Sequence, residues 1–131
     1  MAIEYEIIED KRLVIAKGSG VVTGDDVISH PDNLAADEKY VAPMKKLVDY
    51  SSIDSIMQSH EEVSIIARKK EALKKKLAGE RCAFVSPADL TFGIARVHQA
   101  LIDSTGINAG VFRRIEEALE WLDVELDMNS E

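Results

Sequence analysis

The stretch Cys82-Ala-Phe-Val-Ser-Pro-Ala-Asp89 joins a short apolar run directly to a helix start. A continuous apolar run of strand length, such as Cys82–Val85, is typical of a strand with both faces buried. The residues that follow suit a helix N-terminus, with Ser86 as N-cap, Pro87 at the first helical position and Asp89 in the first turn. The stretch therefore predicts a buried strand followed by a helix, which is the repeating unit of an α/β protein.

Outward from this stretch, strands and helices continue to alternate. The expected strands are Ile3–Ile8, Arg12–Lys17, Lys46–Tyr50, Cys82–Val85 and Gly110–Phe112. The first two are close enough to form an antiparallel hairpin, and strands separated by helices require parallel pairing with right-handed crossovers. The sequence predicts an α/β fold with a single mixed, mostly parallel five-stranded sheet and an N-terminal antiparallel hairpin.

Local signals set the expected limits of the helices. Two of them begin with a capping-box pattern, and the two residue pairs are Thr23 with Asp26 and Ser59 with Glu62. Pro31 should interrupt the first of these helices, because the residue before a proline is disfavoured in the helical region. The second should run to about Ala78, before Gly79. The last helix is expected from Ile115 to Leu122.

Length and composition fit one small globular domain. The chain has 131 residues, of which 46% are hydrophobic and 31% charged. We assign residues 1–122 to the domain and residues 123–131 to an acidic C-terminal tail. A single cysteine, Cys82, favours the cytoplasm and an inert core thiol, and no apolar run approaches the ~18 residues of a membrane span.

The net charge of −8 argues against nucleic-acid binding. Seven basic residues nevertheless lie between Arg68 and Arg81, which is more often a solvated helix face than a binding surface. The three histidines have no metal-ligand spacing, and no motif for a nucleophile or a phosphate loop occurs. The glycines from Gly18 to Gly24 resemble a dinucleotide fingerprint, but Thr23 stands at its third glycine position. We therefore expect no enzymatic activity, no metal and no cofactor.

Polar residues gather where a parallel sheet presents its carboxyl ends, the usual edge for ligands. The segment from Tyr50 to Ser55 offers more hydroxyl groups than helix capping needs. The candidate partner- or ligand-binding residues are Asp49, Tyr50, Ser51, Ser52, Asp54, Ser55, Ser86, Asp89, Phe92 and Arg113.

Three further stretches carry a family resemblance. They are Arg12–Ile15 with Gly20–Thr23; Leu47–Tyr50; and Phe92–Arg96 with Val111–Arg113 and Glu117–Leu122. Together they resemble the SpoIIAA-like branch of the STAS superfamily, whose relatives include anti-sigma factor antagonists. The resemblance implies a bacterial or archaeal cytoplasmic protein with helices mainly on one face of the sheet, a strand order close to sequential and no proven enzymatic activity. In the antagonists a serine of an Asp-Ser-Ser-Gly motif is phosphorylated. Here Asp54-Ser55 is followed by Ile56, and Ser55 is the candidate phosphorylation site.

Two hypotheses for function follow. The first is a non-enzymatic regulatory module that binds a protein partner through the expected loop after the third strand, because the family's relatives do so. The alternative is a carrier of a small apolar ligand or lipid, as in the related Sec14-type domains. That ligand would lie near Phe84, Phe92 and Met57, with the basic residues from Arg68 to Arg81 near anionic headgroups.

The sequence also makes a prediction about assembly. Leu13–Ile15 and Cys82–Val85 are apolar at consecutive positions, so both faces of these strands require cover. Either the segment Asp32–Pro43 or a second copy of the chain would cover the face that the helices leave open. We expect a homodimer, with the acidic tail near the rim of the interface.

Overall fold

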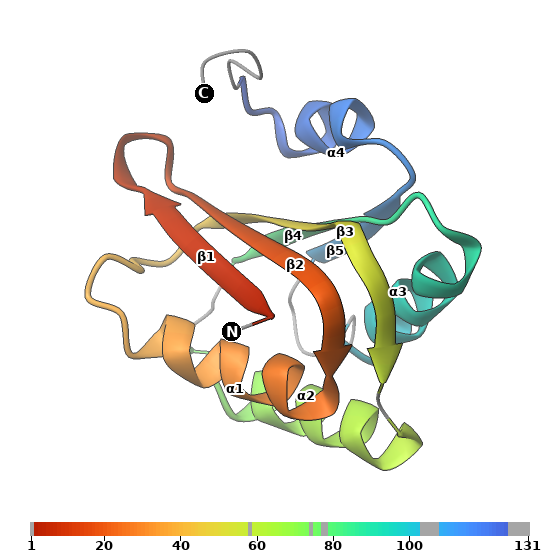
Figure 1. Ribbon diagram of the computed structural model, residues 1–131. Coiled ribbons are helices and arrows are strands. Elements are labelled where there is room, and N and C mark those ends of the chain that lie inside the picture. The colour runs from red at the N-terminus through yellow and green to blue at the C-terminus, as the bar shows by residue number, and fades with distance from the viewer. Residues whose placement is uncertain (1, 58, 74, 77–78, 103–107, 126–131) are drawn as a thin grey trace.

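The computed structural model describes residues 2–57, 59–73, 75–76, 79–102 and 108–125 (Figure 1). The strands are β1 (Ile3–Ile8), β2 (Leu13–Thr23), β3 (Lys45–Met57), β4 (Arg81–Val85) and β5 (Asn108–Phe112). The helices are α1 (Gly24–Ala35), α2 (His60–Ala72), α3 (Asp89–Ile102) and α4 (Ile115–Leu122), with a 3-10 turn, η1 (Glu9–Lys11), between β1 and β2. The sheet has the order β1-β2-β3-β4-β5, and its one antiparallel pair is β1 with β2. The predicted fold class and sequential strand order are confirmed.

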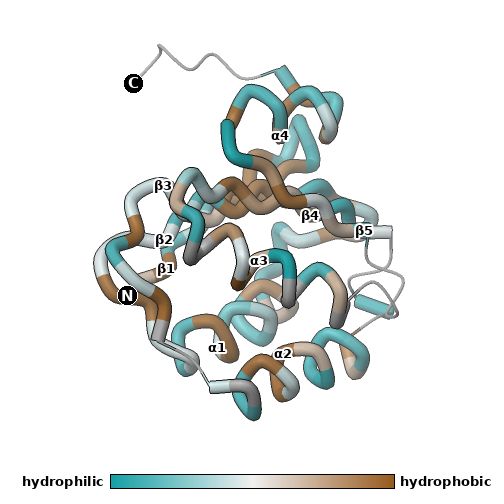
Figure 2. Tube along the Cα trace, turned by 90° about the vertical axis from the view of Figure 1, so that its right-hand side faces the viewer, coloured by the Kyte–Doolittle hydropathy of each residue, from teal (hydrophilic) through white to brown (hydrophobic). Residues whose placement is uncertain are grey.

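The sheet is covered on both faces. Figures 1 and 2 show α1, α2 and α3 on one side of the sheet and α4 on the other. The buried residues of the α4 side are Leu13, Leu47, Ala83, Val85, Ala118, Leu119 and Leu122. Leu34 and Tyr40 belong to the core beneath the other three helices, so Asp32–Pro43 does not cover the second face as expected. Because α4 supplies that cover, the consecutive apolar residues give no reason to expect a second copy.

Both predicted capping boxes are present, and they fix the starts of α1 and α2. The Thr23 N–H donates to the Asp26 carboxylate at 2.9 Å, and the Asp26 N–H donates back to the Thr23 hydroxyl at 3.3 Å. Ser59 and Glu62 repeat the exchange at 2.9 and 3.1 Å. These bonds satisfy backbone donors that lack partners within a helix.

Three expected helix limits are wrong, each because tertiary contacts outweigh a local signal. Helix α1 runs through Pro31, whose ring is buried. Helix α2 ends at Ala72 rather than near Ala78, and the chain turns back there to bring Glu80 against Lys70. Helix α3 begins at Asp89 rather than at Pro87, because the Ser86 N–H donates to Phe112 O at 2.9 Å and so continues the pairing of β4 with β5.

Candidate functional site

The segment expected to be the loop after the third strand is part of the strand itself. β3 extends to Met57 and remains paired with β2 over that length, but its pairing with β4 ends at Asp49. Beyond that point β2 and β3 curve together toward the starts of α1 and α2 (Figure 1). Within the described ranges, no backbone hydrogen bond joins residues 51–56 to any segment except β2. The outer side of β3 is therefore an unpaired strand edge, which we call the β3 edge (residues 51–56).

The predicted site residues of this strand lie in different environments. Ser51, Ser52 and Asp54 are exposed, and Ser55 is half-buried. Asp49 is also half-buried, and its carboxylate accepts the Ser51 N–H at 2.9 Å. Its side chain therefore has a local structural role.

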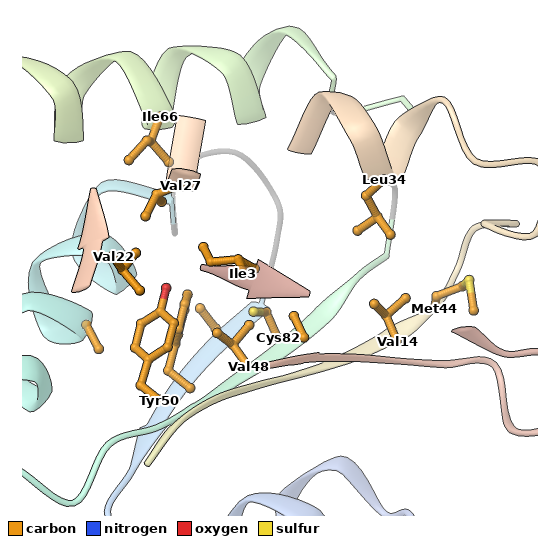
Figure 3. Close-up of a cluster of buried hydrophobic side chains, with 14 of the residues drawn as sticks. Ile3, Val14, Val22, Val27, Leu34, Met44, Val48, Tyr50, Ile66 and Cys82 are labelled. Atoms are coloured by element: carbon orange, nitrogen blue, oxygen red, sulfur yellow. The ribbon is translucent and has the colours of Figure 1, made fainter. Parts of the chain in front are cut away.

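Tyr50 is not on the surface. It is buried, and its ring lies 6.2 Å from that of Phe84, centroid to centroid. Figure 3 shows its side chain among Val22, Val48 and Ile3. Since successive side chains of a strand alternate between faces, Tyr50 belongs to the core beneath the helices.

A second group of predicted residues lies at the ends of β5 and α3. The Arg113 guanidinium is 2.6 Å from the Asp89 carboxylate, donates to Pro87 O at 3.1 Å and stacks 4.1 Å from the centroid of the Phe92 ring. Both charged groups are largely exposed, and such surface pairs are worth at most about 1 kcal/mol. Ser86, in the same region, is fully buried, so it cannot contact another protein.

Sequence reasoning missed a cluster of charged groups inside the core. Lys46, Lys70 and Glu80 are 2%, 5% and 1% exposed. Glu80 Oε1 lies 3.9 Å from Lys46 Nζ and 3.6 Å from Lys70 Nζ. The Tyr40 hydroxyl donates to Glu80 Oε2 at 2.6 Å. One carboxylate thus serves two ammonium groups and a phenol, and we call these four residues the charged core.

Burial and mutual charge shift the protonation equilibria of the charged core. Burial lowers the pKa of Lys46, and the neighbouring Lys70 lowers it further. Burial, the largest single influence, acts to lower the pKa of Lys70, but the Glu80 carboxylate together with Cys82 and the hydrogen bonds to Lys46 and Glu80 raises that pKa. Burial would raise the pKa of Glu80, yet the two lysines and Tyr40 together hold it below its ordinary value. Lys70 and Glu80 are therefore an ion pair, and Lys46 is the group most readily neutralised.

A cavity of about 30 Å³ adjoins the charged core, between the sheet and helices α1 and α2. Its polar lining groups come from His30, Lys46, Tyr50 and Lys70, and the rest of the lining is apolar. His30 Nε2 is buried without a hydrogen-bond partner. Burial, followed by the charges of Lys46 and Lys70, lowers the pKa of His30 to about 2, so its ring is neutral at pH 7.

Strand and helix periodicity could have located these lysines. Lys46 precedes Val48 and Tyr50 by two and four positions, which places all three on one face of β3. Lys70 follows Ile66 by four positions and Val63 by seven, which is the buried stripe of α2.

The basic run from Arg68 to Arg81 does not form one free surface. Lys70 is buried, and Lys69 pairs with Asp32. Arg81 donates to Trp121 O at 2.8 Å and lies 4.3 Å from the centroid of the Trp121 ring. These contacts weaken the case for a basic face toward anionic lipid headgroups.

Neither a membrane-spanning helix nor a metal-binding cluster occurs among the residues that the structure describes. No helix there is long and apolar enough to cross a membrane. No group of three or more histidine, cysteine, aspartate or glutamate side chains is placed to hold a metal ion in that part of the chain.

Comparison with known proteins identifies the fold. No family model and no curated protein matches this chain. Among solved structures, it is similar to an uncharacterized protein of the DUF3478 family with a SpoIIAA-like fold from Shewanella loihica PV-4. The TM-score is 0.58, the sequence identity is 21%, and 92% of each chain is covered. With the sequential, mostly parallel sheet described above, this likeness shows that the chain has a SpoIIAA-like fold.

Proposed function

We propose that this protein is a non-enzymatic cytoplasmic module that binds a protein partner along the β3 edge. The observation that carries the proposal is that β3 extends beyond the end of β4. One side of residues 51–56 therefore has no backbone partner among the described residues. An exposed strand edge accepts an extended segment of another chain, whose backbone completes the ladder of hydrogen bonds. The partner would therefore present a strand and not a helix.

The side chains of the β3 edge favour a polar or basic partner strand. Ser51 and Ser52 supply exposed hydroxyls, and Asp54 supplies an exposed carboxylate. Because the whole protein has a net charge of −8, a basic partner would also be attracted over a longer range. Ser55 is the candidate for phosphorylation on this edge, and a phosphate there would add charge beside Asp54.

A carrier of a small ligand is the second candidate, and the cavity beside the charged core is the observation in its favour. Typical ligand pockets have about 300–1,000 Å³, whereas this cavity has about 30 Å³. An acyl chain does not fit that volume. Phe84 lines the cavity, whereas Phe92 lies against Arg113 and the Met57 side chain is outside the described residues. The structure therefore supports the protein-binding proposal better than a lipid carrier.

The proposal is tested by capture of partners on the immobilised protein, followed by amide hydrogen exchange on the complex. We expect one stoichiometric partner, bound at least tenfold more weakly by Ser52→Lys, because the added positive charge repels a basic partner strand. In the complex, amides of residues 51–56 that face away from β2 should become protected from exchange, because they gain hydrogen bonds.

The matched control is Ser64→Lys, which puts the same change on an exposed position of α2. It should bind the partner as the unmodified protein does. Equal binding by Ser52→Lys, or a complex in which residues 51–56 exchange as fast as in the free protein, would show that the β3 edge is not the site.

A further inference from the structure

The charged core is not electrically balanced when both lysines are protonated. Lys46 and Lys70 lie against one carboxylate, that of Glu80, and no other acidic side chain of the described residues pairs with either. The neighbouring polar groups are the Tyr40 hydroxyl, the Cys82 thiol and the neutral His30 ring. An unpaired ion in a protein interior is costly, so the core has to lose a proton or gain an anion.

The cavity is the place where an anion could be received. Lys46, Lys70 and His30 converge on it from β3, α2 and α1, and Nε2 of His30 is buried there without a partner. The rest of the lining is apolar and includes Val27 and Ile66, one helical turn from His30 and Lys70. Figure 3 shows these two side chains projecting from the helices toward the sheet. The site thus combines a cationic end with an apolar part.

We propose that this cavity binds a small organic monoanion of the short-chain carboxylate class. Its carboxylate lies beside Lys46 and Lys70 where they line the cavity, and its carbon chain lies against Val27 and Ile66. The inference is independent of the β3 edge and of any protein partner.

The charge, the volume and the lining of the cavity each favour a short-chain carboxylate. A single negative charge balances two lysines against one glutamate. A volume of about 30 Å³ holds roughly two water molecules or an anion of a few heavy atoms. The apolar lining disfavours strongly hydrated inorganic anions such as phosphate, which would lose water without gaining hydrogen bonds there.

Binding should be coupled to proton uptake. In the empty site the core is balanced when Lys46 is neutral, since burial and Lys70 both lower its pKa. An arriving carboxylate replaces the missing negative charge and lets Lys46 take up a proton. Lys46 is also faced by Glu80 and Cys82 near β4 and by His30 on α1, and the latter two remain neutral at pH 7. The affinity should therefore fall as the pH rises above the pKa that Lys46 has in the complex.

The experiment is isothermal titration of the whole protein with sodium propionate at pH 7, with sodium chloride at equal ionic strength as the salt control. Formate and hexanoate complete the series. We expect saturable binding of propionate, weaker binding of formate and none of hexanoate. Titration in buffers of different ionisation enthalpy should show net proton uptake.

Lys46→Met should weaken propionate binding at least tenfold. This variant keeps the Lys70–Glu80 pair, which is balanced by itself, and so should fold. Lys69→Met is the matched control, because Lys69 is next to Lys70 on α2 but pairs with Asp32 and does not line the cavity. It should bind propionate as the unmodified protein does.

Three results would overturn the inference: no saturable propionate binding, an equal effect of chloride, or unchanged binding by Lys46→Met. If Lys46→Met does not fold, the inference is tested in the unmodified protein. Magnetisation transfer between ¹³C-propionate and the methyl groups of Val27 and Ile66 would then show whether propionate occupies the cavity. Its absence at saturating propionate would show that the cavity holds only water.

Discussion

The two faces of the sheet are packed by different means. On the α4 side, the buried residues are aliphatic throughout, and one helix of eight residues covers them. The other side is covered by three helices, yet it holds Lys46, Lys70 and Glu80 and a cavity. The α4 side shows that this sheet can be covered by apolar packing alone. Because buried ion clusters are often no more stabilising than apolar residues of similar size, the charged core points to a role other than stability.

The largest effect should follow from Glu80→Gln. This change leaves Lys46 and Lys70 without a carboxylate, and breaking a buried ion pair from one side costs about 3–5 kcal/mol. Urea unfolding at pH 7 measures the free energy of unfolding. Lys46→Met is the counterpart, since it removes the surplus charge and should change the free energy by no more than about 1 kcal/mol. Similar losses in both variants would contradict the idea that the charged core carries a surplus lysine.

Leu122→Ala should show what purely apolar packing contributes on the other face. Leu122 is fully buried, and truncating such a leucine costs about 2–5 kcal/mol, of which we expect about 3 here. The loss should be the same at pH 5 and pH 8, because the buried residues around it do not titrate. A loss that changed by more than about 1 kcal/mol between these pH values would mean that the two faces are energetically coupled.

The smallest expected effect is a loss of stability at acidic pH. The pKa of His30 is about 2 in the folded protein and about 6.5 in the unfolded chain, so below pH 6.5 only the unfolded chain takes up the proton. Stability should thus decrease as the pH falls, by about 1.4 kcal/mol per pH unit, or about 2 kcal/mol at pH 5. Urea unfolding between pH 8 and pH 5 measures this slope. His30→Leu should flatten it, and an unchanged slope in that variant would assign the acid sensitivity to other groups.

Local sequence signals predicted local structure well. The capping boxes at Thr23 and Ser59 involve residues three positions apart, so no distant contact is needed to form them. The hairpin and the start of α4 were likewise predictable from short segments, whereas the order of the strands was implied by the family resemblance. The expected interruption of α1 at Pro31 is wrong because the burial of the proline ring outweighs its local preference against a helix.

The candidate site depended on contacts that no short segment reveals. Residues 50–55 have the composition of a turn, but pairing with residues 19–21 of β2 makes them part of a strand. The charged core unites Tyr40, Lys46, Lys70 and Glu80, which are far apart in the chain. The burial of Lys70 was missed because it belongs to a basic run, which is usually exposed to solvent. Its position on the buried stripe of α2 nevertheless places it in the core.

The single cysteine offers a way to measure how often this core opens to solvent. Cys82 is fully buried in the sheet beneath α1 and α2, and burial raises the pKa of its thiol, so the folded state protects it from thiol reagents. Modification of Cys82 by an excess of such a reagent requires the helix layer to open, and its rate therefore counts those openings. The half-life of the thiol therefore measures how often the core around Cys82 becomes accessible to solvent.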